Sequence, residues 1–311
     1  MEKRQLAAVV VVLGVFCSVA WAGAPLGPPR SLVEHGEWAV NFEYGHEEMD
    51  LYTYGKWSER SRSWVDDDPG EWGEWGDWSC DESGVMEIRD LTANLWFGSL
   101  EYGLCDRWEV FLRLGMADAQ DEVKPVECGA EGVDEVYDFD GDYGFAWGAG
   151  TKMTICQYGD WTFGGVIQVT WLYPDESDLS FEYEKDEDED GTPESMGTIT
   201  GTGELELRQF QAGIGTTLDM DSWFLYGGIC WFFMRGDMDV EIRETVSLPP
   251  VDDPVLYSQT DSKGRHDVDE RSEFGCWFGL GCQLETAVCF AEAQILEDYW
   301  LVGGGVKIPL P

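Results

Sequence analysis

Large side chains alternate with small or polar ones along most of this chain. In residues 161–173, for example, odd positions hold Trp, Phe, Gly, Ile, Val, Trp and Tyr, whereas even positions hold Thr, Gly, Val, Gln, Thr and Leu. A period of two is the signature of β-strands, whose successive side chains point to opposite faces. No long stretch shows helical spacing, so the sequence predicts an all-β protein.

The connections between the alternating runs are themselves alternately short and long. Ten strands are predicted, at about residues 36–54, 85–103, 107–118, 141–155, 161–174, 198–217, 223–241, 271–284, 287–296 and 299–309. Short turns are expected at 104–106, 156–160, 218–222 and 285–286, long segments at 55–84, 119–140, 175–197 and 242–270, and a last short connection near 297–298. An up-and-down antiparallel barrel places all its short turns at one end and its long loops at the other.

The face that carries the large side chains decides between a soluble and a membrane barrel. The opposite face is rich in glycine and long polar residues, which is typical of a crowded lumen. Trp161 and Trp171 share the large face, as do Trp223 and Phe233, and each pair is ten residues apart. Ten residues of a tilted strand rise about 25 Å, the height of the apolar band of an outer-membrane barrel. A transmembrane barrel is therefore expected, with a secreted β-sandwich or lipocalin-like barrel as the alternative.

Charged and amide side chains on the small face are predicted to line the lumen, where the cations can pair with the acids and fill it. The predicted lumen-lining residues are Glu43, Glu109, Arg113, Lys152, Gln168, Glu292 and Lys307. Ten strands enclose a backbone radius of roughly 10 Å, which leaves little space once side chains enter. The sequence leaves two functions open: a narrow cation-preferring pore for small ions or solutes, and a non-conducting surface barrel for adhesion or envelope structure.

The first 22 residues have the composition of a cleaved secretory signal peptide. Lys3 and Arg4 precede an apolar stretch over residues 6–16, and Ala20-Trp21-Ala22 has the small-x-small form of a cleavage site. The expected organisation is a signal peptide over 1–22, a flexible N-terminal segment over 23–35 and a barrel domain over 36–311.

One hairpin carries a resemblance to a known class of proteins. The run Glu101-Tyr102-Gly103-Leu104-Cys105-Asp106-Arg107-Trp108-Glu109-Val110 resembles the tyrosine–glycine–leucine, aspartate–arginine hairpin common in bacterial outer-membrane β-barrel proteins. The resemblance implies export to the outer membrane, with outer-membrane lipid and the barrel-assembly machinery as partners.

The net charge of −43 excludes nucleic acid as a partner, because few cations remain to neutralise phosphates. Most of the acidic residues fall in the long segments, so a strongly anionic external face is expected. It could attract cations, or it could be a solvated, repulsive surface. Asp186, Asp188 and Asp190 open a weak calcium motif, but Gly197 stands where a bidentate glutamate is needed. No cofactor is expected beyond divalent cations bound by the loops.

Neither the histidines nor the cysteines suggest an enzyme. The chain has three histidines and no nucleophile motif beside them. Cys282 and Cys289 flank the turn at 285–286 on one face, where they could form a disulfide or simply be small lipid-facing residues. Cys80 and Cys128, in neighbouring long segments, are the stronger disulfide candidates in an exported chain.

Overall fold

In the computed structural model, the described residues are 24–63, 76, 79–126, 137–185, 195–247, 257–297 and 299–310. They form one antiparallel sheet of eleven strands. The strands are β1 (Trp38–Ser63), β2 (Ser79–Cys105), β3 (Trp108–Val126), β4 (Tyr137–Tyr158), β5 (Trp161–Tyr173), β6 (Ser177–Lys185), β7 (Ser195–Met220), β8 (Trp223–Ser247), β9 (Tyr257–Gln283), β10 (Val288–Ile295) and β11 (Tyr299–Leu310). Among these residues no helix is long and apolar enough to cross a membrane.

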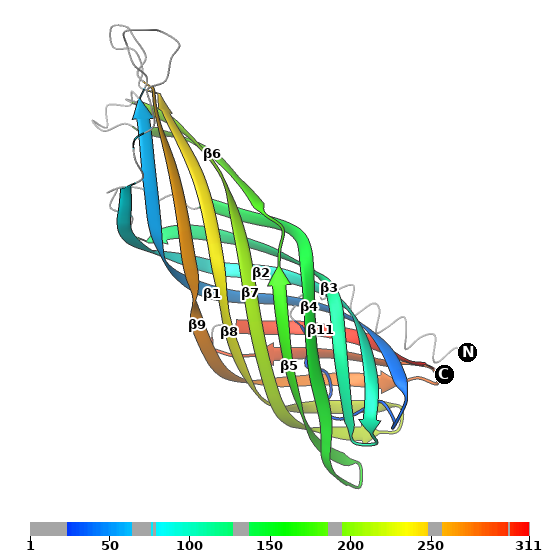
Figure 1. Cartoon of the computed structure of the whole chain (residues 1–311). Helices are drawn as coiled ribbons and strands as arrows, with labels where there is room; N and C mark the ends of the chain where they lie inside the picture. The colour runs from blue at the N-terminus through cyan, green and yellow to red at the C-terminus, as the bar shows by residue number, and fades with distance from the viewer. Residues whose placement is uncertain are drawn as a thin grey trace.

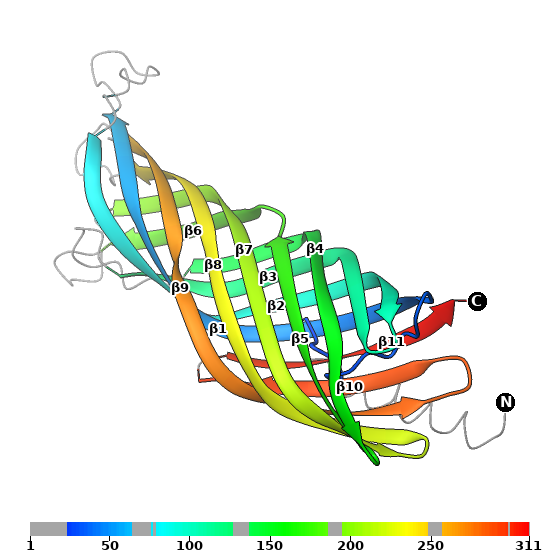
Figure 2. The same ribbon diagram turned by 60° about the horizontal axis from the view of Figure 1, so that its bottom comes forward.

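The sheet closes on itself through two pairings. β1 pairs with β11, and β5 pairs with β7, so that a ring runs through every described strand except β6 (Figures 1 and 2). β6 follows β5 after a break at Pro174 and adds to the far part of β7. The predicted up-and-down barrel of ten strands is confirmed, with β6 as a strand that the sequence did not predict.

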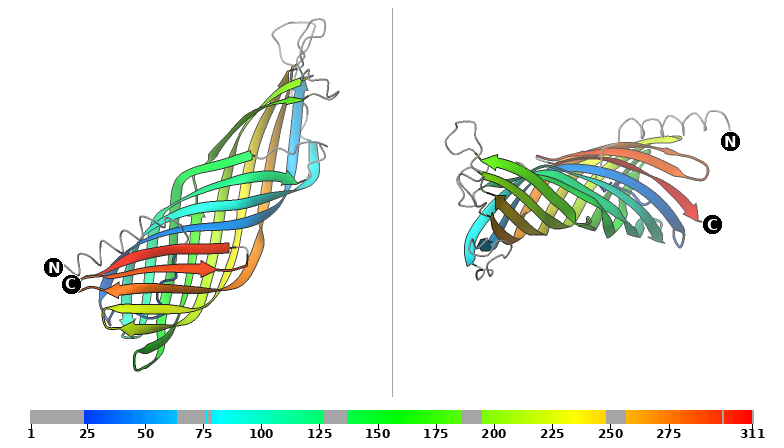
Figure 3. Two further views of the ribbon diagram at one scale, coloured as in Figure 1. Left: turned by 180° about the vertical axis from the view of Figure 1, so that it is seen from behind. Right: turned by 90° about the horizontal axis from the view of Figure 1, so that it is seen from above.

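The strands differ greatly in length. β1, β2, β7, β8 and β9 have 25 to 27 residues, whereas β10 has 8 and β11 has 12. Beyond the ends of β10 and β11, β1 pairs directly with β9, from Thr53 with Val268 to Ser63 with Ser258. The long strands thus continue past the closed barrel as a protruding sheet, which we call the β-extension (residues 53–63, 197–206, 237–247 and 257–268; Figure 3).

The β-extension corrects the predicted loop boundaries. Residues 55–63, 242–247 and 257–270 were expected in long loops but are strand. The outward face of the β-extension carries acids and bases that pair across strands, for example Asp239 with Arg265 at 3.7 Å. Because charged side chains replace the large residues here, the period-two signal that marks the membrane part fades although the backbone pairing continues.

The large residues of the closed barrel point outward. Phe42, Leu112, Ile167, Ile229 and Phe278 are each about half exposed or more. An exposed apolar belt of this extent, around an interior that holds charged residues, matches a membrane barrel and excludes the soluble alternative.

Aromatic side chains gather at both edges of this belt. At one edge the rings of Trp147 and Trp171 stack with their centroids 4.1 Å apart. At the other, Trp161 and Trp223 follow the short turns, as predicted. Trp38, the first residue of β1, pairs with Leu310 at the end of β11, so both ends of the barrel domain lie beside the short turns. In outer-membrane barrels this end faces the periplasm.

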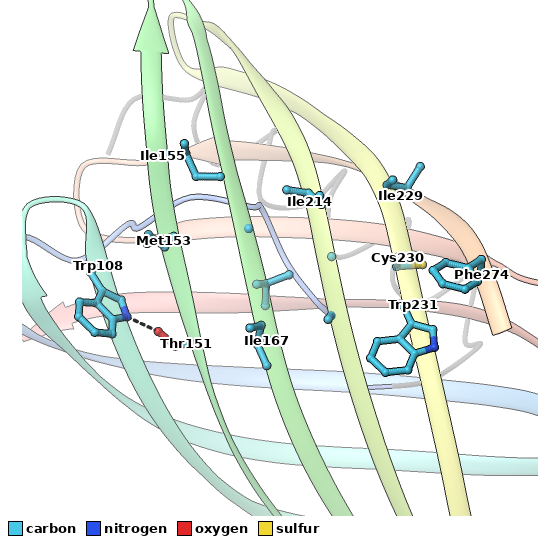
Figure 4. Close-up of a pocket in the computed structure, with 14 residues that line it drawn as sticks. Trp108, Thr151, Met153, Ile155, Ile167, Ile214, Ile229, Cys230, Trp231 and Phe274 are labelled. Carbon is cyan, nitrogen blue, oxygen red and sulfur yellow. Dashed lines mark hydrogen bonds between the residues drawn. The ribbon is translucent and has the colours of Figure 1, made fainter. Parts of the chain in front are cut away.

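The apolar belt contains a shallow hollow over β5 and β7. Its lining includes the small residues Gly165, Ala212 and Gly213. Larger apolar side chains, among them Ile167, Ile214 and Ile229, also line it (Figure 4). The indole of Trp108 donates a hydrogen bond to Thr151 Oγ1 at its edge, 2.5 Å away. The hollow is lined almost entirely by apolar groups, as expected of a surface that lipid chains cover.

Candidate functional site: the lumen

The seven residues predicted to line the lumen all lie inside the barrel and are almost completely buried. Their exposed fractions run from 0% for Glu109 and Arg113 to 7% for Glu43. A charge so far from water needs a partner of opposite sign and further hydrogen bonds. The partners of each group therefore define what the lumen can do.

Lys307 on β11 bridges two glutamates of neighbouring strands. Its Nζ lies 2.5 Å from a carboxylate oxygen of Glu101 and 3.0 Å from one of Glu109. All three side chains are at most 2% exposed. The bridge ties β11 to β2 and β3 across the interior.

Arg113 on β3 makes a second cluster. Its guanidinium lies 3.8 Å from Glu43 and donates a hydrogen bond to Thr170, and it covers the ring of Phe97 with 4.9 Å to the centroid. Asn41 donates a further hydrogen bond to Glu43 at 2.7 Å. Five glutamates (Glu43, Glu47, Glu101, Glu109 and Glu292) and three cations (Arg113, Lys152 and Lys307) are buried inside the barrel, and their side chains occupy the space that a pore would need.

The chain before β1 also lies inside the barrel. We call residues 24–34 the N-terminal plug. Ala24 and Leu26 are completely buried. Glu292 on β10 accepts hydrogen bonds from the backbone N–H groups of Leu26 and Gly27, each at 2.7 Å. The sequence placed a flexible segment over 23–35 and gave no sign that it enters the lumen.

Glu109 holds the other end of the N-terminal plug. One of its carboxylate oxygens accepts hydrogen bonds from the backbone N–H groups of Leu32 at 2.6 Å and Val33 at 3.0 Å. Its other oxygen binds Lys307. Glu109 therefore joins the charge network to the N-terminal plug. Gln168 adds a weaker contact, donating to the carbonyl of Ala24 at 3.3 Å.

Trp277 fills the lumen beside the N-terminal plug, and glycines make room for it. A Cβ on Gly213 would lie 2.9 Å from the indole ring, and one on Gly228 only 2.6 Å from it. The indole N–H of Trp277 points at the carbonyl of Gly27, 3.4 Å away. The inward glycines thus do not widen a channel, because an aromatic ring occupies the space they leave.

An apolar layer closes the lumen above the charged clusters. Its inward side chains come from strands all around the ring, and each is at most 2% exposed; they include Met49, Leu51, Leu91, Leu95, Leu172, Leu205, Leu207, Met234, Tyr299 and Leu301. Glu47 lies among them and is satisfied by the hydroxyl of Tyr299 at 3.0 Å and by Gln209. A water-filled channel would expose the side chains that line it, and these are not exposed.

Other predicted sites lie elsewhere or outside the described residues. The weak calcium candidate at Asp186, Asp188 and Asp190 is outside them, and so is Cys128. Among the residues that the structure describes, no group of three or more His, Cys, Asp or Glu side chains could hold a metal ion.

The three histidines do not form a cluster. His35 precedes β1 and contacts the carbonyl of Leu104, His46 lies within β1, and His266 is opposite Gly55 in the β-extension. His35 thus lies before the start of β1, His46 in its first half and His266 beside its second half. The three imidazoles are therefore too far apart along the barrel to share one acid–base site.

Similar solved structures share little of this chain's sequence. No protein-family model matches the sequence, and no curated protein matches it. Among solved structures, the outer membrane protein OprG from Pseudomonas aeruginosa is similar, with 11% identity, coverage of 89% of this chain and 97% of that chain, and a TM-score of 0.40. The outer membrane protease OmpT from Escherichia coli has 8% identity, 93% and 99% coverage, and a TM-score of 0.39. The translocator domain of the autotransporter NalP from Neisseria meningitidis has 11% identity, 99% and 96% coverage, and a TM-score of 0.34.

The exposed apolar belt, the aromatic edges and the charged interior together define the class of the molecule. The chain is an integral β-barrel of the bacterial outer-membrane type, with a filled lumen.

Proposed function

We propose that the protein is a non-conducting surface barrel, which anchors the β-extension and its acidic loops at the outside of the cell for adhesion or envelope structure. The observation that carries this proposal is the filling of the lumen in two layers. The charged clusters and the N-terminal plug fill the half near the short turns, and the apolar layer fills the half below the β-extension.

The cation-preferring pore is less well supported by this arrangement. Ions need a continuous path of water, because an ion in an apolar layer loses its hydration at a cost of many kcal/mol. Movement of the N-terminal plug alone would leave the apolar layer of Leu51, Leu95 and Leu207 in place. The protein is therefore proposed as a closed barrel rather than a gated channel.

The β-extension gives this surface role a physical form. About ten residues of a tilted strand cross the membrane, so strands of 25 to 27 residues continue for roughly 15 more. At about 3.3 Å per residue and a tilt near 40°, that amounts to roughly 38 Å beyond the bilayer. The paired strands therefore end well clear of the lipid headgroups.

The remaining assignments follow from this role. Residues 1–22 act as a cleaved signal peptide, the barrel-assembly machinery inserts the chain, and outer-membrane lipid surrounds the apolar belt. The acidic connections, including Asp186, Asp188 and Asp190, bind divalent cations loosely by charge. No catalytic activity is proposed.

A liposome-swelling assay tests the proposal. Proteoliposomes of the refolded protein should swell no faster than empty liposomes in small sugars and amino acids, whereas an open porin in parallel vesicles should swell rapidly. Swelling that rises with the amount of folded barrel would overturn the proposal in favour of a pore.

A further inference from the structure

Cys282 on β9 and Cys289 on β10 are directly opposite each other in the sheet. The two strands form a tight hairpin, in which Leu284 N–H donates to the carbonyl of Ala287 at 2.8 Å. In the register of this hairpin, Cys289 is the partner of Cys282. The structure holds both as free thiols.

The backbone places these two residues at the right separation for a covalent link. Directly opposed residues of antiparallel strands have Cα atoms about 4.5–5.5 Å apart and side chains on one face. Disulfides need Cα atoms about 4.4–6.8 Å apart. The direct register of Cys282 and Cys289 meets this requirement. No backbone movement is needed to join them.

The other free cysteines that the structure describes lack this relationship. Cys230 is opposite Gly275, and Cys276 is opposite Ile229 and Ile295. Cys230 is buried and Cys276 is exposed, so they lie on different faces of the barrel wall. Cys105 and Cys156 are opposite Trp108 and Phe163.

We propose that Cys282 and Cys289 form a disulfide that locks the β9–β10 hairpin. Both thiols lose their S–H bonds and one S–S bond forms. The two electrons and two protons pass to the disulfide of a periplasmic thiol–disulfide exchange protein, which becomes a dithiol.

Burial sets the time at which the bond forms. The two residues are only 3% and 7% exposed in the folded barrel, and Trp223 and Val306 are their partners on the flanking strands. Oxidation therefore takes place in the periplasm before the barrel closes, and the closed barrel then shields the bond from reductants.

The bond has a structural consequence for the lumen. β10 is the shortest described strand, and it carries Glu292, which holds the N-terminal plug. Glu292 is three residues from Cys289. A covalent link next to the turn fixes the register of β10 and hence the position of the Glu292 carboxylate.

Sequential labelling of the protein taken directly from outer membranes tests this inference. Cells are quenched in acid, denatured and treated with N-ethylmaleimide, then reduced and treated with iodoacetamide. We expect Cys282 and Cys289 to carry only the second label, and Cys105 and Cys156 to carry the first. First label on both Cys282 and Cys289, or linkage of either one to a different cysteine, would overturn the proposal.

A variant provides an independent readout. In Cys282→Ser, Cys289 should change completely from the second label to the first, and Cys276→Ser should leave both unchanged. If Cys289 of Cys282→Ser still carried the second label, its partner would be another cysteine and the proposal would be wrong. If a variant does not assemble, the labelling of the wild-type protein still shows whether Cys282 and Cys289 form a disulfide.

Discussion

Glu292 on β10 binds the backbone of Gly27, a residue that precedes it by 265 positions, through a hydrogen bond of 2.7 Å inside the barrel. Its second oxygen binds the adjacent amide of Leu26 at the same distance. A carboxylate is well suited to this task, because two oxygens can each accept a hydrogen bond from successive N–H groups. These two hydrogen bonds attach residues 26 and 27 of the N-terminal plug to β10, the shortest described strand.

Glu292→Gln should loosen the N-terminal plug. Glutamine keeps one acceptor oxygen but presents an NH₂ group to the other backbone donor, so one buried N–H loses its partner. Hydrogen bonds to charged groups contribute about 1.5–3 kcal/mol. Hydrogen–deuterium exchange of residues 24–34 in detergent micelles should accelerate by about ten-fold or more. Glu297→Gln, an exposed change just beyond β10, is the control and should have no effect. Unchanged exchange in Glu292→Gln would show that this carboxylate does not hold the plug.

Gly213→Ala should destabilise the barrel through Trp277. The new Cβ would lie 2.9 Å and 3.0 Å from two atoms of the indole, so the ring or the strand must shift. Overpacking of this kind costs about 1–3 kcal/mol. The urea concentration at the midpoint of unfolding should fall. In the double variant with Trp277→Phe, part of this decrease should be recovered.

Gly98→Ala is the matched control for Gly213→Ala, because its Cβ would approach nothing closer than 4.0 Å. Its midpoint should stay close to wild type. An equal loss in both variants would mean that the effect comes from glycine in a strand and not from contact with Trp277.

Ile167→Arg tests the membrane belt. Ile167 is 49% exposed on the outer face of the closed barrel, where lipid is expected. Arginine near the midplane of the bilayer costs about 2–4 kcal/mol. The free energy of unfolding in lipid vesicles should fall by that amount. Ser61→Arg, an exposed change on the β-extension opposite Thr260, should be nearly neutral since this position meets water. Equal tolerance of both changes would contradict the placement of the belt.

Asp261 should make the β-extension sensitive to acid. The hydrogen bond from Arg243, with help from Arg60, lowers the pKa of Asp261 although burial opposes the shift. A carboxyl with a lowered pKa in the folded protein stabilises it above the ordinary pKa of aspartate, and that contribution is lost as the pH falls through the lowered value.

The expected signature is a pH-dependent difference between wild type and Asp261→Asn. Protection of residues 257–268 against exchange, corrected for intrinsic rates, should be higher in the wild type at pH 7. The protection of residues 257–268 should become equal in the two proteins as the pH falls and Asp261 becomes protonated. A difference that stays constant down to strongly acidic pH would show that ionisation of Asp261 contributes nothing.

The membrane part of the fold could be predicted from the sequence because alternate residues of each strand face two different environments, the lipid and the lumen. Lipid requires side chains such as Ile167 and Leu112 on one face, and the narrow lumen requires glycine or paired polar groups on the other. The pairing of Arg113 with Glu43 and of Lys307 with Glu109 follows from the same argument. Much of the β-extension lacks this contrast, so residues 55–63, 242–247 and 257–268 were expected in loops.

The N-terminal plug could not be predicted for a different reason. The partners of Glu109 and Glu292 there are backbone N–H groups, which every residue except proline carries. Nothing in the side chains of Leu26 or Val33 distinguishes a segment that enters a lumen from one that remains outside. The pairing of acids and cations predicted for the lumen indicated a filled interior, but it did not indicate that residues 24–34 are part of the filling.

Single-channel recording in planar lipid bilayers tests the closed lumen most directly. In about 1 M KCl, a salt concentration at which screening makes the charge of the loops unimportant, the wild type should give no discrete current steps. Arg113→Ala should be equally silent, because the apolar layer of Leu51, Leu95 and Leu207 lies above the site of the change. Reproducible unitary currents from the folded wild-type barrel would contradict the account.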